Sequence, residues 1–279
     1  MIVRDALRSD KAAIASLLYF ERYVHRHLDW RAPLDWLERK PFVLLEENQR
    51  VEAVLACPSD PPEVAWIRLF AIANRVDFEA VWLPLWELAY QRLQEQAPQP
   101  HSAAIPLTSW FRSLIELSGF QQTNEVVVLK WKATKPKWID PRNPAIKLRP
   151  MSIDDITRVA EIDHQAFQPP WQVSLDGIMA GFNQSALAMV AEYNTTIIGY
   201  QICTASNNGG HLARLAVLPE WQHQGIGSIL VVDLQQQFLE QGYDQVTVNT
   251  QADNQASLLL YEKLGFQRTG ERYPLYEFP

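Results

Sequence analysis

Short apolar segments alternate with amphipathic runs along this chain, and the same order of segments occurs twice. Each copy begins with a short apolar segment ending in arginine, at residues 2–4 and 146–149, followed by an acidic helix start and an amphipathic run. Two apolar segments then meet at Asn48 in the first copy and at Asn194 in the second. Because asparagine tolerates the backbone of tight turns, each of these positions predicts a hairpin.

The remaining segments of each copy complete one α/β pattern. After the hairpin we expect a third strand with alternating residues, a long helix, a strand, a short helix ending at Gly119 or Gly265, and a final strand. The hairpin strands are expected at 42–46 and 51–57 and at 188–192 and 197–203, and the third strands at 66–72 and 212–218. This order predicts an α/β fold with a mixed, mostly antiparallel central sheet and helices on both faces.

The two copies are related by a constant offset of 146 residues. Glu46, Asn48, Cys57, Glu116, Gly119 and Phe120 return as Glu192, Asn194, Cys203, Glu262, Gly265 and Phe266. A register held without a gap predicts one fold used twice, so the differences between the copies should reflect function. We expect two domains, at residues 1–135 and 145–279, joined by a proline-rich linker at 136–144.

Composition places the chain among soluble proteins. Its 279 residues carry a net charge of −7, with 14 acidic against 8 basic residues from position 141 onward. This acidity argues against nucleic-acid binding, which needs a basic surface. No apolar stretch approaches the roughly 18 residues of a membrane helix, and the N-terminus lacks the pattern of a signal peptide. Cys57 and Cys203 share one strand position, so we expect buried free thiols and a cytoplasmic protein.

The loop between the third strand and the long helix of the second copy has the composition of an anion-binding site. It runs from Pro219 to Ser228 and contains Gly225 and Gly227. Glycines let backbone N–H groups crowd around a phosphate, and the helix N-terminus adds partial positive charge there. The first copy has Asp77 and Glu79 and no glycine at these positions. The alternative is that the glycines only form a tight turn, since the first copy makes the same connection without them.

A polar helix face accompanies the loop. Asn254, Ser257 and Tyr261 are spaced three and four apart and therefore share one face of the short helix. Asn254 could instead cap this helix by accepting a hydrogen bond from the N–H of Ser257, and Tyr261 could simply pack with its hydroxyl at the surface. The corresponding face of the first copy is mostly apolar and consists of Thr108, Phe111 and Ile115.

Residues 212–266 resemble the GNAT acyl-CoA-dependent N-acetyltransferases. The resemblance rests on three motifs: Leu215-Ala216-Val217, the loop from Gln222 to Gly227, and the spacing of Asn254, Ser257, Tyr261, Gly265 and Phe266. The first copy resembles a degenerate GNAT domain, so the chain is similar in layout to the tandem mycothiol synthases. The segment from Glu161 to Phe167, followed by Pro170 and Trp171, resembles the acceptor-side helix and loop of ribosomal-protein alanine acetyltransferases.

This resemblance implies acetyl-CoA as the cosubstrate and no metal. The pyrophosphate would lie on the glycine loop, the pantetheine arm would pair with Leu215 and Val217, and the backbone there would polarise the thioester carbonyl. Tyr261 is the implied catalytic residue and would assist the leaving thiolate. The implied cofactor-binding residues are Leu215, Ala216, Val217, Gln222, His223, Gln224, Gly225, Ile226, Gly227, Ser228, Asn254 and Ser257.

One position departs from the pattern. Ribosomal-protein alanine acetyltransferases carry a glutamate base on the strand after the long helix, and Asn249 occupies that position here. Glu192 and His211 are the nearest alternatives by strand position, although the recurrence of Glu192 as Glu46 favours a structural role for it. In the absence of a strong base, we favour an acceptor amine of low pKa or deprotonation through water.

The sequence therefore predicts an N-acetyltransferase that moves an acetyl group from acetyl-CoA to a primary amine by direct attack in a ternary complex. The acceptor would be a small-molecule amine or a peptide N-terminus, with no nucleic-acid or membrane partner. The alternative is a non-catalytic coenzyme A-binding sensor or scaffold. The first copy would bury surface, shape the acceptor cleft or mediate a homodimer, and its eight tryptophans before residue 139 suggest an apolar surface that needs cover.

Overall fold

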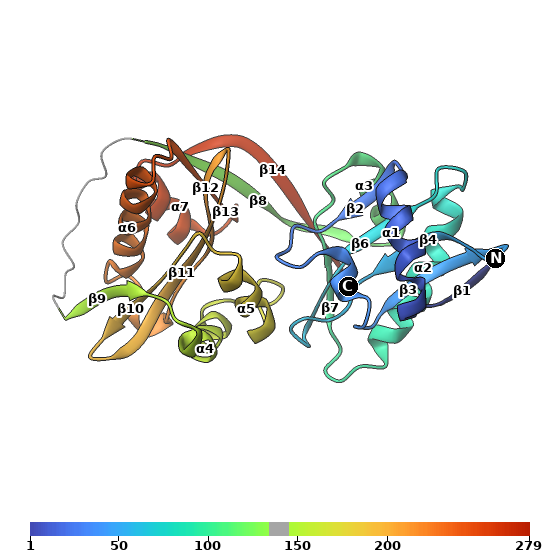
Figure 1. Cartoon of the computed structure of the whole chain (residues 1–279), viewed down its shortest axis with the longest axis horizontal. Helices are drawn as coiled ribbons and strands as arrows, with labels where there is room; N and C mark the ends of the chain where they lie inside the picture. Colours follow the sequence, from blue (N-terminus) through green and yellow to red (C-terminus); the bar gives the residue numbers. More distant parts are fainter. Residues whose placement is uncertain (134–144) are drawn as a thin grey trace. The chain divides into compact units, whose positions relative to one another are not determined.

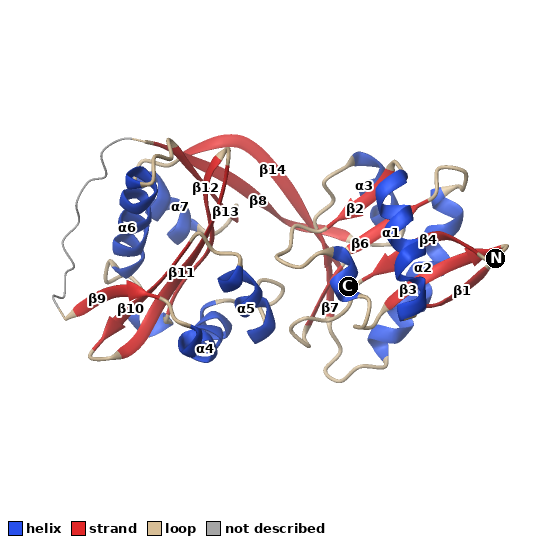
Figure 2. Ribbon diagram, viewed as in Figure 1, coloured by secondary structure: helices blue, strands red, loops and turns tan. Residues whose placement is uncertain are grey.

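The computed structural model describes residues 1–133 and 145–279, which form two compact units (Figures 1 and 2). Unit 1 comprises Met1–Thr123 and Tyr273–Pro279, and unit 2 comprises Asn124–Arg272. The linker expected at 136–144 lies outside the described residues. In the described part of the chain no helix is both long and apolar enough to cross a membrane.

The first copy follows the predicted order of elements, with the additional strand β2 and with the expected third strand divided in two. The elements are β1 (Ile2–Asp5), α1 (Lys11–Phe20), β2 (Tyr23–Arg26), β3 (Phe42–Glu47), β4 (Arg50–Ala56), β5 (Val64–Trp66), β6 (Leu69–Ile72), α2 (Phe78–Gln94), β7 (His101–Ala104), α3 (Ser109–Leu117) and β8 (Gln121–Lys132). Five strands pair in the order β1-β3-β4-β6-β2, and the added strand β2 forms one edge of that sheet.

The second copy repeats this plan with a second helix before its hairpin. The elements are β9 (Ile146–Pro150), α4 (Ile156–Ala166), α5 (Leu175–Asn183), β10 (Leu187–Tyr193), β11 (Thr196–Ser206), β12 (Gly209–Val217), α6 (Ile226–Glu240), β13 (Gln245–Gln251), α7 (Gln255–Lys263) and β14 (Gln267–Phe278). As predicted, α3 and α7 end before Gly119 and Gly265, whose φ angles of 90° and 88° lie in the left-handed region.

The helices of unit 2 cover both faces of its sheet. Neighbouring residues of a strand point to opposite faces, and on β11 Tyr200 bonds Asp163 of α4 whereas Gln201 bonds Asp233 of α6. Consequently α4 and α6 pack on opposite sides of the same strands. From β9 to β10, β11, β12, β13 and β8, neighbouring strands pair antiparallel except β12 with β13, which confirms the predicted mixed, mostly antiparallel sheet.

The final strands of the two copies are exchanged between the units, so the units end at different residues from the sequence copies. In unit 2, β13 pairs antiparallel with Val126–Lys132 of β8, a strand of the first copy. In unit 1, β7 pairs with Tyr276–Phe278 of β14, the last strand of the second copy. In Figure 1 the red C-terminal end accordingly lies in the blue and cyan unit. The bounds expected at residues 135 and 145 ignore this exchange.

Several of the tryptophans lie in the core. Trp36, Trp82 and Trp131 are each 1% exposed, the first two within unit 1 and the third on the part of β8 that belongs to unit 2. The incoming end of β14 joins this core, where the Phe278 ring lies 5.2 Å from that of Trp86. The apolar surface suggested by the tryptophan count is therefore wrong for these side chains, because they are buried.

The 146-residue offset holds in the hairpins but not in the third strand. Ala53 and Gly199 are related by the offset. Ala53 pairs with Ile72, whose equivalent by the offset is Leu218, but Gly199 pairs with the preceding residue, Val217. The predicted strand 66–72 is in fact divided into β5 and β6, and a bulge interrupts the pairing of β12 with β11. The two copies therefore place their irregularity differently. Cys57 and Cys203 are buried free thiols, as predicted.

Candidate active site

Strand β12 leaves one edge unpaired over its second half. It pairs with β11 along most of its length, but its parallel pairing with β13 covers only Gly210–Leu212. The two strands thus diverge after Leu212, where the sequence is Ala213-Arg214-Leu215-Ala216-Val217. Backbone groups at such an edge need hydrogen-bond partners, so the edge can accept an extended ligand as an added strand. This places Leu215 to Val217 where the sequence analysis expects a pantetheine arm.

The glycine loop begins directly beyond this edge. Gly225 is the N-cap of α6 with φ 90°, and a Cβ built on it would meet no atom within 4 Å. The N–H groups of Ile226, Gly227 and Ser228 form the first turn of α6, where no intrahelical acceptor exists for them. These donors and the helix dipole create a site for an anion in open space.

The side chains of the loop hold its own backbone. Gln222 Nε2 donates to the carbonyl of Val217 at 3.0 Å, and Gln224 Nε2 donates to the carbonyl of Glu220 at 3.1 Å. His223 has a φ of 60°, so this non-glycine residue also adopts the left-handed region. Gly227 has a different role, because its Cβ would lie 3.2 Å from Leu260 of α7. It permits the close packing of α6 on α7.

The helix face predicted from residues 254, 257 and 261 combines a cap with a buried phenol. Asn254 Oδ1 accepts from the Ser257 N–H at 3.1 Å, which confirms the capping alternative. Tyr261 is only 5% exposed, so its ring packs inside the unit. Within the described residues its hydroxyl makes no hydrogen bond, and burial raises its pKa well above the usual value. The side chain therefore stays a neutral phenol.

A buried ion pair lies on the α4 side of β12. Asp163 of α4 is fully buried and accepts from Arg214 Nε at 2.6 Å and Nη2 at 2.9 Å, and from the Tyr200 hydroxyl at 2.5 Å. The Arg214 guanidinium also lies 3.7 Å from the centre of the Phe167 ring. Arg214 lies within the unpaired edge, so this cluster fixes α4 and its following loop against that edge. Sequence reasoning missed the pair, although charged residues at these apolar positions were the available signal.

The structure separates the two alternative bases. Arg149 Nε donates to Glu192 Oε1 at 2.8 Å and its other nitrogens bond Asp155, and in unit 1 Arg4 bonds Glu46 and Asp10 in the same way. Because both units contain this cluster, Glu192 has a structural role. His211 instead lies on β12 with its Nδ1 2.9 Å from Thr247 Oγ1, next to the region where the strands diverge. Asn249 is exposed on β13.

In unit 1 the equivalent cleft is filled by the chain itself. Strand β2 pairs antiparallel with β6 over Leu69–Ile72, along the edge that corresponds to the free edge of β12. The Tyr23 ring lies 5.8 Å from Phe78 at the start of α2 and 5.5 Å from Trp110 of α3, and His25 stacks on Phe111 at 3.9 Å. The 146 offset relates Phe78, Trp110 and Phe111 to Gln224, Ala256 and Ser257. Aromatic rings thus occupy the position of the glycine loop and polar face.

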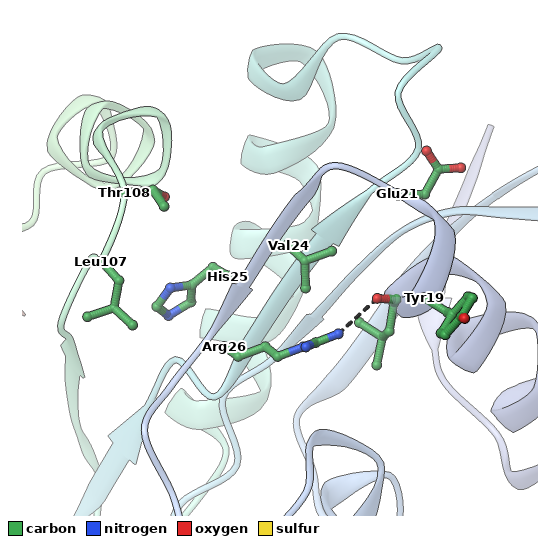
Figure 3. Close-up of a pocket in the computed structure, with 8 residues that line it drawn as sticks. Tyr19, Glu21, Val24, His25, Arg26, Leu107 and Thr108 are labelled. Carbon is green, nitrogen blue, oxygen red and sulfur yellow. Dashed lines mark hydrogen bonds between the residues drawn. The ribbon is translucent and has the colours of Figure 1, made fainter. Parts of the chain in front are cut away.

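A pocket of about 510 Å³ remains beside β2 in unit 1 (Figure 3). Arg26 Nη2 donates to the Leu18 carbonyl at 2.8 Å across it. The buried ring of His25 reaches the pocket, and burial lowers its pKa to about 4, so it is neutral at pH 7. The pocket contains no glycine-rich helix start. It is lined by Leu18, Tyr19, Glu21, Val24, His25, Arg26, Leu107 and Thr108.

Comparisons with known proteins agree with this geometry. The sequence model of the acetyltransferase (GNAT) family matches residues 156–266. The [ribosomal protein bS18]-alanine N-acetyltransferase of Haemophilus influenzae is 31% identical over 125 residues, which are 45% of this chain and 84% of that protein. The N-alpha-acetyltransferase 30 of Schizosaccharomyces pombe is 31% identical, over 32% of this chain and 63% of its own length. The chain belongs to the GNAT family and is an acetyltransferase.

The tandem arrangement also has a structural counterpart. A tandem GNAT protein from the clavulanic acid biosynthesis pathway superposes with a TM-score of 0.61 at 12% identity, covering 99% of this chain and 97% of that one. At this identity the likeness establishes the fold alone. Both units are therefore GNAT-like domains, and acetyltransferases of this family use acetyl-CoA.

Proposed function

We propose that unit 2 transfers an acetyl group from acetyl-CoA to the α-amine of a peptide N-terminus, by direct attack in a ternary complex. The observation that carries this proposal is the unpaired edge of β12 leading into the Gly225 cap of α6. Two relatives named for acetylation of a protein N-terminus supply the class of acceptor. A small primary amine is the second acceptor class.

The residues of the cleft fit the chemical parts of acetyl-CoA. The N–H groups at the start of α6, from Ile226 to Ser228, would hold the pyrophosphate. The backbone of Leu215 and Val217 would pair with the amides of pantetheine, which resemble a short peptide strand. Asn254 Oδ1 is already used by the helix cap, so any contact of this residue with coenzyme A would come from its amide nitrogen.

The same edge would also support the reaction. A free backbone N–H near Leu215 would donate to the thioester oxygen as negative charge develops there, and preorganised donors of this kind lower the barrier substantially. Tyr261 would donate a hydrogen bond to the sulfur of the departing thiolate. Its raised pKa makes it a poor proton source but keeps its O–H in place.

The acceptor class follows from the ionisation of amines. Neutralising a lysine amine with a pKa near 10.4 costs about 4–5 kcal/mol at pH 7, whereas an α-amine near 8 costs only about 1–2 kcal/mol. Asn249 supplies no carboxylate base, and Glu192 is bound to Arg149. A site without a strong carboxylate base is therefore better suited to an α-amine than to a lysine side chain.

Thiol release from acetyl-CoA with a panel of acceptors would test the proposal. We expect turnover with peptides that have a free N-terminus, and little with the same peptides blocked at the N-terminus but containing lysine. Tyr261→Phe should lower kcat about 10- to 100-fold, the value of one hydrogen bond to a charged group, while acetyl-CoA affinity changes less than about twofold. Tight binding of acetyl-CoA without turnover on any amine would favour the sensor alternative.

A further inference from the structure

His211 contacts a threonine, whereas the acidic side chains of α4 are paired with arginine. Its Nδ1 lies 2.9 Å from Thr247 Oγ1, and burial lowers the pKa of His211 against the opposing effect of a hydrogen bond with the backbone of Thr247. Nearby acidic side chains are already bonded: Asp163 to Arg214 and Glu161 to Arg158. The imidazole is therefore neutral at pH 7, and a neutral imidazole is a base.

One arrangement of the hydrogen bonds around Thr247 gives His211 the tautomer that is useful for catalysis. Thr247 Oγ1 also lies 3.5 Å from the carbonyl of Gly210, to which its hydroxyl can donate. When the hydroxyl donates there, its oxygen accepts from the Nδ1–H of His211. The lone pair of the imidazole is then on Nε2, away from Thr247. The arrangement orients the base without charging it.

The position of His211 puts it on the acceptor side of the sheet. Gly210 faces Phe238 of α6, so the next residue, His211, points to the face covered by α4. Thr247 and Asn249 are alternate residues of β13 and share this face. Asn249 is exposed, so water reaches the face at this position. His211 thus lies one residue before the end of the β12–β13 pairing, where the strands begin to diverge.

Few charged groups surround this face. Lys130 of β8 is the residue paired with Thr247 of β13, so the two side chains lie on the same face of the sheet. Asp163 of α4 is neutralised by Arg214 of β12 itself. The titratable or charged side chains on the elements around β12 are Tyr200 and Cys203 on β11, Glu125, Lys130 and Lys132 on β8, Arg158, Glu161, Asp163 and His164 on α4, and Asp233 and Glu240 on α6.

Unit 1 has lost this arrangement together with its cleft. In its parallel strand pair, Val64 is the residue opposite His101, as His211 is opposite Thr247. The 146 offset places Ala103 at the position of Asn249. Both Val64 and Ala103 are fully buried and apolar. A histidine present only in the unit with the open cleft is expected to serve that cleft.

We propose that His211 is the general base of the acetyl transfer, acting directly or through one water, with Thr247 as its positioning residue. This inference rests on the proposed function. Nε2 takes one proton from the acceptor ammonium, and the freed lone pair forms the new C–N bond. The C–S bond then breaks and its electron pair leaves on sulfur. The amide nitrogen loses its second proton, the thiolate gains one, and the proton on His211 passes to solvent.

The pH dependence of kcat, measured on the full chain with a saturating N-terminal peptide, provides the test. In the wild type, kcat should fall as pH drops through the lowered pKa of His211, below about 6.5, because the protonated imidazole cannot accept a proton. His211→Asn should lower kcat at pH 7 by about 10²–10³-fold. Its remaining activity should rise up to the pKa of the acceptor amine, near 8.

Three further measurements separate chemistry from structure. An acceptor amine that is already neutral at pH 7 should lose far less activity in His211→Asn, and Asn249→Glu added to that variant should restore part of kcat. Thr247→Val should lower kcat about tenfold. His101→Asn, the same change on β7 of unit 1, should leave the profile unaltered. Acetyl-CoA affinity, measured by calorimetry, should be unchanged in His211→Asn, which shows that the variant is folded.

Two results would overturn the inference. One is a His211→Asn enzyme that keeps the wild-type pH profile, and the other is an equal loss of activity with ammonium and with neutral amines. Either result would leave the proposed function intact, since turnover would still be observed. A wild-type protein that acetylates no amine would instead refute the proposed function itself.

Discussion

The two units of this protein share one fold but treat the same cleft in opposite ways. In unit 2 the second half of β12 is unpaired and a left-handed glycine starts the following helix. In unit 1 strand β2 pairs with the corresponding edge, and rings from Tyr23, Phe78 and Trp110 pack at the helix starts. A diverging strand pair leaves a gap: in unit 1 the chain's own strand and side chains fill it, and in unit 2 we propose that a ligand does.

What the units have in common is structural. The cluster of Arg4, Asp10 and Glu46 is repeated by Arg149, Asp155 and Glu192, and in both units arginine lowers the pKa of the aspartate. What differs is confined to the cleft and its surroundings. Apolar residues of unit 1 occupy the positions of Ser257, Tyr261 and His211. The loop of unit 1 is polar but contains no glycine. This contrast supports the proposal that acetyl transfer takes place in unit 2.

Removing β8, one of the exchanged final strands, should have the largest effect on folding. A fragment of residues 145–279 lacks β8, which lies between β13 and β14 in unit 2, so its sheet would expose two strand edges. We expect it to be insoluble or unfolded. A fragment of residues 120–279 retains β8 and should fold and bind acetyl-CoA. Circular dichroism and calorimetry on the two fragments would compare them, and equal behaviour would contradict a structural role for β8.

Exchanging one residue between the clefts should produce the next largest effect. Ser257→Phe places in unit 2 the side chain that Phe111 provides in unit 1, and it should weaken acetyl-CoA binding at least about 100-fold while the melting temperature stays nearly constant. Phe111→Ser removes a fully buried ring and should destabilise the protein by about 3–5 kcal/mol without creating a second binding site. Acetyl-CoA binding at normal strength in Ser257→Phe would break the comparison.

Local features of the fold could be predicted from the sequence. The hairpins at Asn48 and Asn194, the glycine stops at Gly119 and Gly265, and the helix after Gly225 depend on neighbouring residues and are present in the structure. In both hairpins the asparagine has the positive φ that the turn requires. Amphipathic spacing and turn residues carry this information within a few positions.

Features that depend on distant partners could not be predicted. The sequence of β8 reads as a final strand whether it pairs within its own copy or with β13, and nothing local specifies β13. The segment Tyr23–Arg26 becomes a strand because β6, more than 40 residues away, offers a free edge. The Asp163–Arg214 pair likewise forms only when α4 packs on β12. The glycine loop and the helix face with Tyr261 follow from the residue pattern, whereas their roles toward acetyl-CoA come from the resemblance and stay a prediction.

Calorimetric titration of acetyl-CoA into the full chain tests the central claim most directly. We predict one site per chain, abolished by Gly225→Glu, because the substitution strains a left-handed residue and puts a carboxylate where the phosphates bind. Gly242→Glu is the matched control, since Gly242 has a φ of 85°, lies at the other end of α6 and has no atom within 4 Å of its Cβ position. Two sites per chain, no binding, or full affinity in Gly225→Glu would contradict the account.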